Sequence, residues 1–280
     1  MQELNQLTNG IKKMLSFNHI GNLGRLANQM FQYASLKGIA RNRGYDFCIP
    51  PRNVFGQIDE LVRGDYLTIY DVFDIENNNN IQISKNPILH ERDHDFDEKL
   101  FRSCPDNVDL LGYYQTSKYF DHIKDEIKND FTFSNEVDTL CAEMFDSVKD
   151  GKNVISLHIR RTDYTVNPNH PVQPMSYYEQ ALKKFNKNDK IIVFSDDPKW
   201  CQEQELFADD SIMISEGNDA DIDLCLMSKC NYHIIANSSF SWWGAWLADS
   251  EQIIAPINWF ANSTASKSVK DMAFGSWMWL

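Results

Sequence analysis

Short apolar runs alternate with amphipathic segments along the second half of the chain. Runs rich in β-branched residues predict strands at 154–158, 191–194, 211–214, 232–236 and 252–255. Apolar residues at helical spacing between these runs predict helices at about 176–186, 198–206, 219–229 and 240–249. Strands that alternate with helices are typical of an α/β domain with a doubly wound parallel sheet.

The first half carries one clear strand–turn–helix unit. Residues 14–20 predict a strand, Gly21–Arg25 a tight glycine turn, and 26–42 a helix. Together they predict half of a nucleotide-binding unit. The segment 45–130 is less regular, apart from a predicted strand at 110–114 and a predicted helix at 116–128.

A polar stretch at 146–153 separates the two halves. It predicts a domain boundary near residue 150, with an N-terminal domain over 1–150 and a C-terminal domain over 151–280. The length of 280 residues fits one large or two modest domains.

Composition and charge narrow the class of protein. With 42% apolar and 24% charged residues the chain is typical of a globular protein, and a net charge of −13 argues against nucleic acid as a partner. None of the six cysteines forms a C-x-x-C pair, so we expect reduced core thiols and a cytoplasmic protein. No apolar run reaches about 18 residues, so at most peripheral membrane association is expected.

Polar clusters follow three of the predicted strands, at His158–Tyr164, Ser195–Asp197 and Asn237–Ser241. In a parallel sheet, the carboxyl ends of the strands open onto one crevice, where ligands bind. Arginines, hydroxyl groups and a helix N-terminus at that edge suit a phosphate. The sequence therefore predicts an enzyme that acts on a nucleotide or a nucleotide sugar.

Arg160 is the strongest candidate in the first cluster. Its guanidinium offers a planar fork of donors that matches diphosphate oxygens and stabilises charge on a leaving group. Arg161 is expected to point the other way and to pair with Asp163. The alternative is a purely structural network of arginines and aspartates at the sheet edge.

The other two clusters have plain structural alternatives. Ser238 and Ser239 lie where a helix begins, which is both an anion site and an ordinary N-cap. Asp196 and Asp197 suit a divalent metal, but Asp197 before Pro198 also suits a helix start, and an arginine site makes a metal unnecessary. We expect no metal ion. Further along, Trp242, Trp243 and Trp246 are expected in the core.

Asp221 and Asp223 open the predicted helix 219–229. They are either carboxylates that complement the helix dipole or a contact for N1 and N2 of guanine, and the residues alone leave both open.

These clusters resemble those of the α-1,2-fucosyltransferase family over roughly residues 14–256. His158–Tyr164 resembles the family's H-x-R-R-x-D-Y signature, and Ser195–Asp197 and Asn237–Leu247 are similar to its next two blocks. Gly24–Ala34 resembles its amino-terminal G-x-L-G-N-Q-x-F-Q-Y-A motif, with Ala27 where the family usually has glycine, and Gly112–Phe120 its G-Y-x-Q-x-x-x-Y-F stretch. Four blocks in the family's order are highly specific.

The resemblance implies a GT-B type fold, in which two Rossmann-like domains with parallel sheets face each other. It implies GDP-β-L-fucose as the donor, inversion at the anomeric carbon, no cofactor or metal, and a galactose-terminated glycan as the acceptor. Arg160 then resembles the catalytic arginine on the diphosphate. The substrate-binding positions that it implies are Asn28, His158, Arg161, Asp163, Asp223, Ser238, Ser239 and Phe240.

Two other functions stay open at this point. The chain could use a different nucleotide sugar, which a panel of donors would reveal. It could also be a non-catalytic module that binds glycan or nucleotide, which would release no GDP. Acceptor choice is expected to depend on segment 45–130 and on the loop 165–174.

Overall fold

The computed structural model describes residues 13–52, 67–75, 85–261 and 269–280. It divides into two compact units, the first with Met1–Tyr70 and Ile75–Asp130, the second with Asp71–Asp74 and Phe131–Leu280. The first unit thus ends at Asp130, whereas the polar stretch at 146–153 predicts a boundary near residue 150. Helix α5 (Asn135–Lys149) lies between these two positions and packs on α8 (Ala220–Lys229) of the second unit, so it is counted with that unit.

The first unit contains a four-stranded parallel sheet in the order β2-β1-β4-β3. Its strands are β1 (Met14–Ser16), β2 (Asp46–Cys48), β3 (Ile88–His90) and β4 (Val108–Leu111). Its α-helices are α1 (Leu26–Arg43), α2 (Ile69–Val72), which ends in the second unit, α3 (Glu98–Ser103) and α4 (Lys124–Asp130). The predicted helix at 116–128 is instead two 3₁₀ turns, Ser117–Tyr119 and Asp121–Ile123, followed by α4.

Helix α1 forms the centre of the first unit and confirms the predicted strand–turn–helix motif. Its residues from Leu26 to Ala40 are buried except for the half-buried Asn28, and the helix ends at Gly44, whose positive φ of 65° forms a left-handed C-cap. Gly38 has no room for a side chain, because a Cβ there would lie 2.1 Å from the carbonyl oxygen of Tyr119. The glycine therefore lets the helix pack directly on the backbone of the neighbouring turn.

The second unit contains a six-stranded parallel sheet in the order β10-β9-β8-β5-β6-β7. The strands are β5 (Val154–Ile159), β6 (Lys190–Ser195), β7 (Ile212–Ile214), β8 (Tyr232–Ile234), β9 (Gln252–Ala255) and β10 (Trp277–Trp279). Counted from β5, the order is third, second, first, fourth, fifth, sixth, as in a dinucleotide-binding sheet. The chain changes direction across the sheet between β5 and β8.

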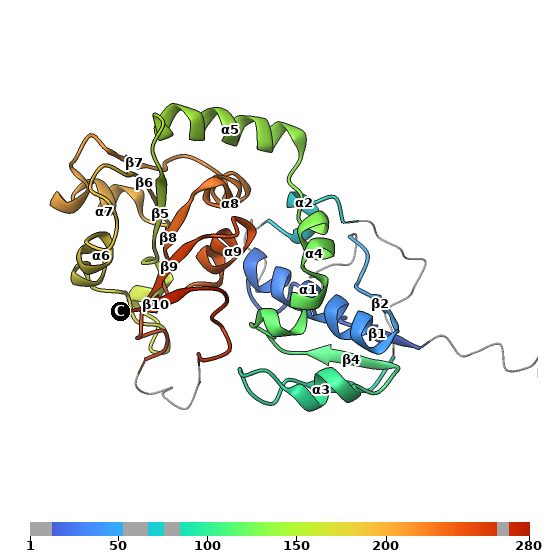
Figure 1. The fold of residues 1–280 in the computed structure, drawn as a ribbon. Coiled ribbons are helices and arrows are strands. Elements are labelled where there is room, and N and C mark those ends of the chain that lie inside the picture. Colours follow the sequence, from blue (N-terminus) through green and yellow to red (C-terminus); the bar gives the residue numbers. More distant parts are fainter. Residues whose placement is uncertain (1–12, 53–66, 76–84, 262–268) are drawn as a thin grey trace, which may run out of the picture. The chain divides into compact units, whose positions relative to one another are not determined.

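Helices cover both faces of the second sheet (Figure 1). The helices are α5 (Asn135–Lys149), α6 (Met175–Leu182), α7 (Pro198–Gln202), α8 (Ala220–Lys229) and α9 (Ser239–Leu247), with 3₁₀ turns at Asp163–Thr165 and Glu205–Phe207. Alternate residues of β5 divide between the faces: Leu157 packs with α6 and α7, and Val154 packs with α5 and α8. This pattern explains why the strands are mainly apolar, although Ser156 and His158 of β5 are buried polar residues.

The core of the second unit contains the three tryptophans of α9, as predicted. Trp242, Trp243 and Trp246 are at most 1% exposed, and the indole N–H of Trp242 donates to the carbonyl of Met272 at 2.6 Å. All six cysteines are buried with free thiols, as expected. None of the helices in the described ranges is long and apolar enough to span a bilayer.

Candidate active site at the carboxyl edge of the second sheet

The three polar clusters lie at one edge of the second sheet, as the sequence predicted. Strand β5 pairs in parallel with β6 on one side and with β8 on the other. The carboxyl ends of the three strands therefore lie side by side, and the residues that follow Ile159, Ser195 and Ile234 lie close together. The sheet order reverses between β5 and β8. Open α/β sheets bind their ligands at such a switch point.

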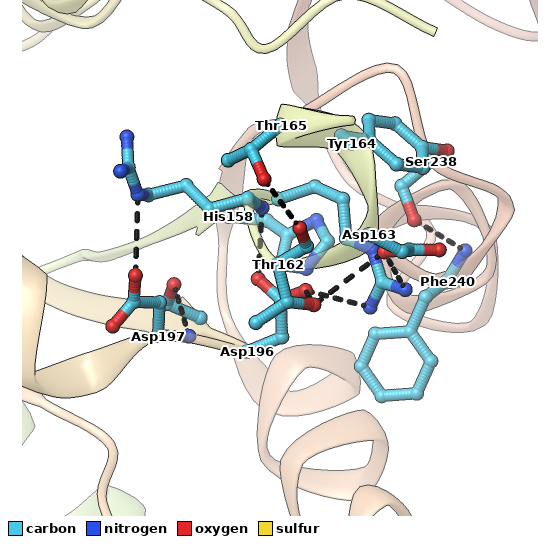
Figure 2. Close-up of polar contacts among 12 residues, drawn as sticks. His158, Thr162, Asp163, Tyr164, Thr165, Asp196, Asp197, Ser238 and Phe240 are labelled. Carbon is cyan, nitrogen blue, oxygen red and sulfur yellow. Dashed lines mark hydrogen bonds and ion pairs between the residues drawn. The ribbon is translucent and has the colours of Figure 1, made fainter. Parts of the chain in front are cut away.

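Arg160 follows β5 at this edge and is held by the carboxylates of Asp163 and Asp196. Figure 2 labels both aspartates. Its Nη2 atom is 2.5 Å from Asp163 Oδ1, and its Nη1 atom is 3.2 Å from Asp196 Oδ2. The guanidinium also lies 5.4 Å from the centre of the Tyr164 ring. The side chain is 16% exposed, so a ligand can reach a cation whose direction is already fixed.

Asp196 holds the turn that follows β5. Its carboxylate accepts from the backbone N–H of Arg161 at 2.8 Å and from the hydroxyl of Thr162, and it also pairs with Arg160. The sequence leaves a metal-binding role for Asp196 open but does not favour it, and in the structure Asp196 anchors the turn that carries Arg160. The pairing of β5 with β6 brings the two strand ends together and so explains this contact.

Arg161 points away from Arg160, as expected, but its partner is not Asp163. Its Nε atom lies 3.3 Å from Asp197 Oδ2, and its guanidinium stacks 3.7 Å from the centre of the Trp200 ring. The expected pair with Asp163 is therefore wrong, because Asp163 lies in the next turn on the side of Arg160.

Asp197 also begins helix α7, which confirms its predicted role as a cap. It accepts from the N–H of Trp200 at 3.4 Å, and Pro198 follows in the first turn. No group of three or more potential metal ligands occurs among the described residues. In this structure Asp196 pairs with Arg160, and Asp197 pairs with Arg161 and caps helix α7.

His158 is the penultimate residue of β5 and is almost completely buried. Its Nδ1 atom is 2.9 Å from Ser241 Oγ. Burial, together with the positive charge of Arg160, lowers the pKa of His158 to about 3, although the carboxylate of Asp196 opposes the shift. The imidazole is therefore neutral near pH 7 and offers hydrogen bonds rather than charge.

Helix α9 begins directly after β8 and turns its first residues to the same edge. The hydroxyl of Ser238 accepts from the N–H of Phe240 at 3.3 Å, which confirms the predicted N-cap. Phe240 lies 5.9 Å from the ring of His158, and Ser239 is the first helical residue. The carbonyl of Asn237 accepts from the hydroxyl of Tyr164 at 3.0 Å, which ties β8 to the arginine turn.

Asp223 lies in the first turn of α8, after β7. Its Oδ1 atom accepts from the hydroxyl of Ser215 at 2.6 Å, and Asn218 in turn donates to that hydroxyl at 2.9 Å. Burial raises the pKa of Asp223 from 3.8 to about 6, although the hydrogen bond from Ser215 opposes the shift. The folded protein therefore holds the proton of Asp223 more tightly than the unfolded chain does. The stability that this difference provides is lost as the pH rises through the folded pKa of about 6, and the acid is mostly ionised at pH 7.

Asn28 belongs to the first unit and is described within it. Gly24, with a φ of 91°, leaves space for Asn28, because a Cβ on Gly24 would lie 1.9 Å from the amide nitrogen of Asn28. Its Oδ1 atom accepts from Gln115 at 2.8 Å. Ala27, the departure from the motif, is a buried residue within α1.

Several partners of these residues were not identified from the sequence. Thr162 and Tyr164 hold the arginine turn, Trp200 stacks on Arg161, and Ser215 binds Asp223. All lie within about eight residues of a strand end in the printed sequence, so the strand ends were the available signal. Their side-chain partners depend on strands that are distant in the chain.

Comparison with known proteins finds a matching family and several relatives. The model of the family described as "Glycosyl transferase family 11" matches residues 3–280. The O-antigen biosynthesis glycosyltransferase WbnK of Escherichia coli is 39% identical in an alignment that covers 58% of this chain and 58% of that protein. The alpha-1,2-colitosyltransferase of Escherichia coli is 32% identical over 85% of this chain and 90% of its own length. A galactoside alpha-(1,2)-fucosyltransferase 2 of Sus scrofa is 28% identical over 84% and 70%.

A solved structure shares the fold. The crystal structure of the alpha-1,6-fucosyltransferase NodZ soaked with GDP-fucose superposes with a TM-score of 0.55 at 14% identity, over 88% of this chain and 96% of NodZ. This match confirms the expected α/β fold of GT-B fucosyltransferases with two parallel sheets. A family description that spans almost the whole chain, and relatives in bacteria and mammals, show that the chain belongs to glycosyl transferase family 11, the α-1,2-fucosyltransferase family.

Proposed function

We propose that the chain is an inverting galactoside α-1,2-fucosyltransferase, which moves L-fucose from GDP-β-L-fucose to O2 of a terminal galactose in a glycan. The observation that carries the proposal is Arg160 in a family 11 chain, fixed at the switch point of a Rossmann-like sheet. A diphosphate leaving group needs a cation at that place. The second unit is the proposed donor domain, and the first unit is the proposed acceptor side.

The proposed donor contacts follow the strand ends. Arg160 binds the diphosphate, and Ser238, Ser239 and Phe240 offer the start of α9 to a phosphate. His158 and Asp223 contact the guanine base, with the neutral imidazole and the buried carboxylate as hydrogen-bonding groups. Asn28 is a further proposed donor contact, on the resemblance of its motif Gly24–Ala34 alone. Arg161 and Asp163 complete the charged surroundings of Arg160.

The proposed reaction is one displacement at the anomeric carbon. The acceptor oxygen forms the new glycosidic bond on the face opposite GDP, and the electrons of the bond between C1 and the phosphate oxygen leave with GDP. Negative charge grows on the diphosphate, where Arg160 and the α9 N-terminus stabilise it. The hydroxyl proton passes to a base, and the transition state has oxocarbenium character.

A second donor is favoured by one specific observation. The relative that matches 85% of this chain is a colitosyltransferase, and colitose lacks the 3-hydroxyl group of fucose. A site with polar groups built for that hydroxyl would discriminate strongly against its absence. A GDP-activated colitose donor is therefore the main alternative to GDP-fucose, with the same linkage and the same residues.

We propose the cytoplasm as the place of action, with at most peripheral contact with a membrane. Six buried free thiols suit a reducing compartment. A galactose-terminated glycan is the proposed acceptor, and the net charge of −13 does not suit nucleic acid as a partner.

The function is tested by measuring GDP release from GDP-fucose and from GDP-colitose, with and without lactose or N-acetyllactosamine. We expect release from GDP-fucose that depends on the acceptor and is unchanged by EDTA, because Arg160 takes the place of a metal on the diphosphate. NMR of the product would identify the linkage. Preference for the colitose donor would correct the sugar, and donor binding without any release would support a non-catalytic module.

Donor binding is also expected to depend on pH through Asp223. Guanine donates to a carboxylate only when the acid is ionised, and the raised pKa of about 6 places that ionisation in an accessible range. The affinity for GDP-fucose should therefore rise about tenfold between pH 5 and pH 7. Titration calorimetry at both values measures it. In Asp223→Asn the affinity should be lower at pH 7 and almost independent of pH, whereas an unchanged slope would contradict the guanine contact.

A further inference from the structure

In the structure, the carboxylates around Arg160 outnumber the arginines and oppose the binding of an anion. Arg160 and Arg161 are surrounded by Asp163, Asp196 and Asp197, so the cluster carries a net charge of −1 when all five groups are ionised. His158 adds no charge, because its pKa is about 3. A nucleoside diphosphate brings at least two further negative charges. It can bind well only if one of the three carboxylates leaves the arginines.

Two of the three carboxylates are held by several groups. Asp196 accepts from the N–H of Arg161 and from the Thr162 hydroxyl besides Arg160, and it is 18% exposed. Asp197 begins helix α7 and pairs with Arg161. The loss of either one would break the turn after β5 or the start of a helix, in addition to an ion pair.

Asp163 is held much less firmly. Its short contact is the ion pair with Arg160 at 2.5 Å, and the Thr162 hydroxyl reaches it only at 3.5 Å. It is 45% exposed, the highest fraction of the three, and it begins the short 3₁₀ turn Asp163–Thr165. Its carboxylate can therefore turn into water at little cost in desolvation.

We infer that Asp163 is a built-in counter-ion that occupies Arg160 in the absence of donor and is displaced by the donor's diphosphate. Asp196 stays in place and acts as the positioning residue that keeps the guanidinium directed at the ligand. The exchange replaces one charge-assisted contact at Nη2 by another, and the two arginines and two aspartates that remain carry no net charge to repel the diphosphate. The inference rests on the proposed function, because it takes a nucleoside diphosphate as the ligand.

The test is the affinity for GDP at pH 7.5, measured by titration calorimetry for the wild type and the variants Asp163→Asn and Asp196→Asn. Loss of the competing carboxylate in Asp163→Asn should tighten GDP binding about three- to fivefold. Loss of the anchor in Asp196→Asn should weaken it about tenfold or more. Asp146→Asn removes the same charge from an exposed pair with Lys149 on α5, and it should leave the affinity unchanged.

Opposite signs for the two site variants, with a flat control, would support the exchange. Unchanged or weaker binding in Asp163→Asn would overturn it while the wild type's GDP binding leaves the proposed function standing. If the wild type does not bind GDP, the proposed function fails and the exchange fails with it. Asp163→Ser gives a second measurement if Asp163→Asn does not fold, and thermal melting of each variant checks folding.

Discussion

Replacing Arg160 by alanine is expected to lower kcat by about three orders of magnitude, while the protein keeps its fold. The guanidinium is the proposed partner of a diphosphate on which negative charge grows during the reaction, and groups with that role contribute about this much. The fold should survive because Arg160 lies at the edge of the sheet and not in the core. Steady-state GDP release, with circular dichroism of the same samples, measures both results.

Two further variants separate charge from geometry. Arg160→Lys keeps the charge but loses the planar fork, so we expect intermediate activity, well below that of the wild type. Arg102→Ala removes an exposed arginine that pairs with Glu98 on α3, and it should leave kcat unchanged. An Arg160→Ala enzyme with nearly normal turnover would contradict the assignment of Arg160 as the catalytic residue.

Replacing Trp243 by alanine is expected to reduce the free energy of unfolding by about 3–5 kcal/mol. The side chain is completely buried, and its ring lies 5.0 Å from Trp242, 5.2 Å from Trp246 and 5.3 Å from Phe131. Alanine would leave a cavity among these rings and remove their edge-to-face contacts. Urea unfolding, followed by tryptophan fluorescence, measures the change.

Val166→Ala provides the comparison for this loss, because Val166 is 83% exposed. We expect a change within about 0.5 kcal/mol for this exposed position. A loss of less than about 1 kcal/mol for Trp243→Ala would mean that the tryptophans of α9 do not form a tightly packed core.

The elements of the second unit were largely predictable because their local patterns agree with their environment. Strands buried on both faces need mainly apolar runs, and β5 and β6 have them, although Ser156 and His158 interrupt the run of β5. Helix α5 was missed although Val137, Cys141 and Met144 recur at helical spacing, because its last turn lies in the polar stretch 146–153 that predicts a domain boundary. The segment Trp277–Trp279 becomes β10 only because β9 offers it a partner.

The site divides in the same way. The positions of Arg160, Asp196 and Ser238 at strand ends followed from the sequence, since alternating strands and helices dictate a parallel sheet whose carboxyl ends share one edge. The interpretation of Asp197 as a cap also followed, because Asp before Pro is a local signal. The pairing of Arg161 with Asp163 was wrong, because proximity in sequence does not decide which carboxylate a guanidinium reaches.

The sequence by itself determined the class of fold, the edge at which the polar groups gather and the family to which they belong. Those properties depend on local periodicity and on short motifs, which a single chain displays directly. Only the tertiary structure decided that Asp196 anchors the turn after β5 and that Asp163 forms an ion pair with Arg160. It also decided that burial lowers the pKa of His158 and raises that of Asp223. These depend on strand order and on exclusion of water, which arise when residues far apart in the chain are brought together.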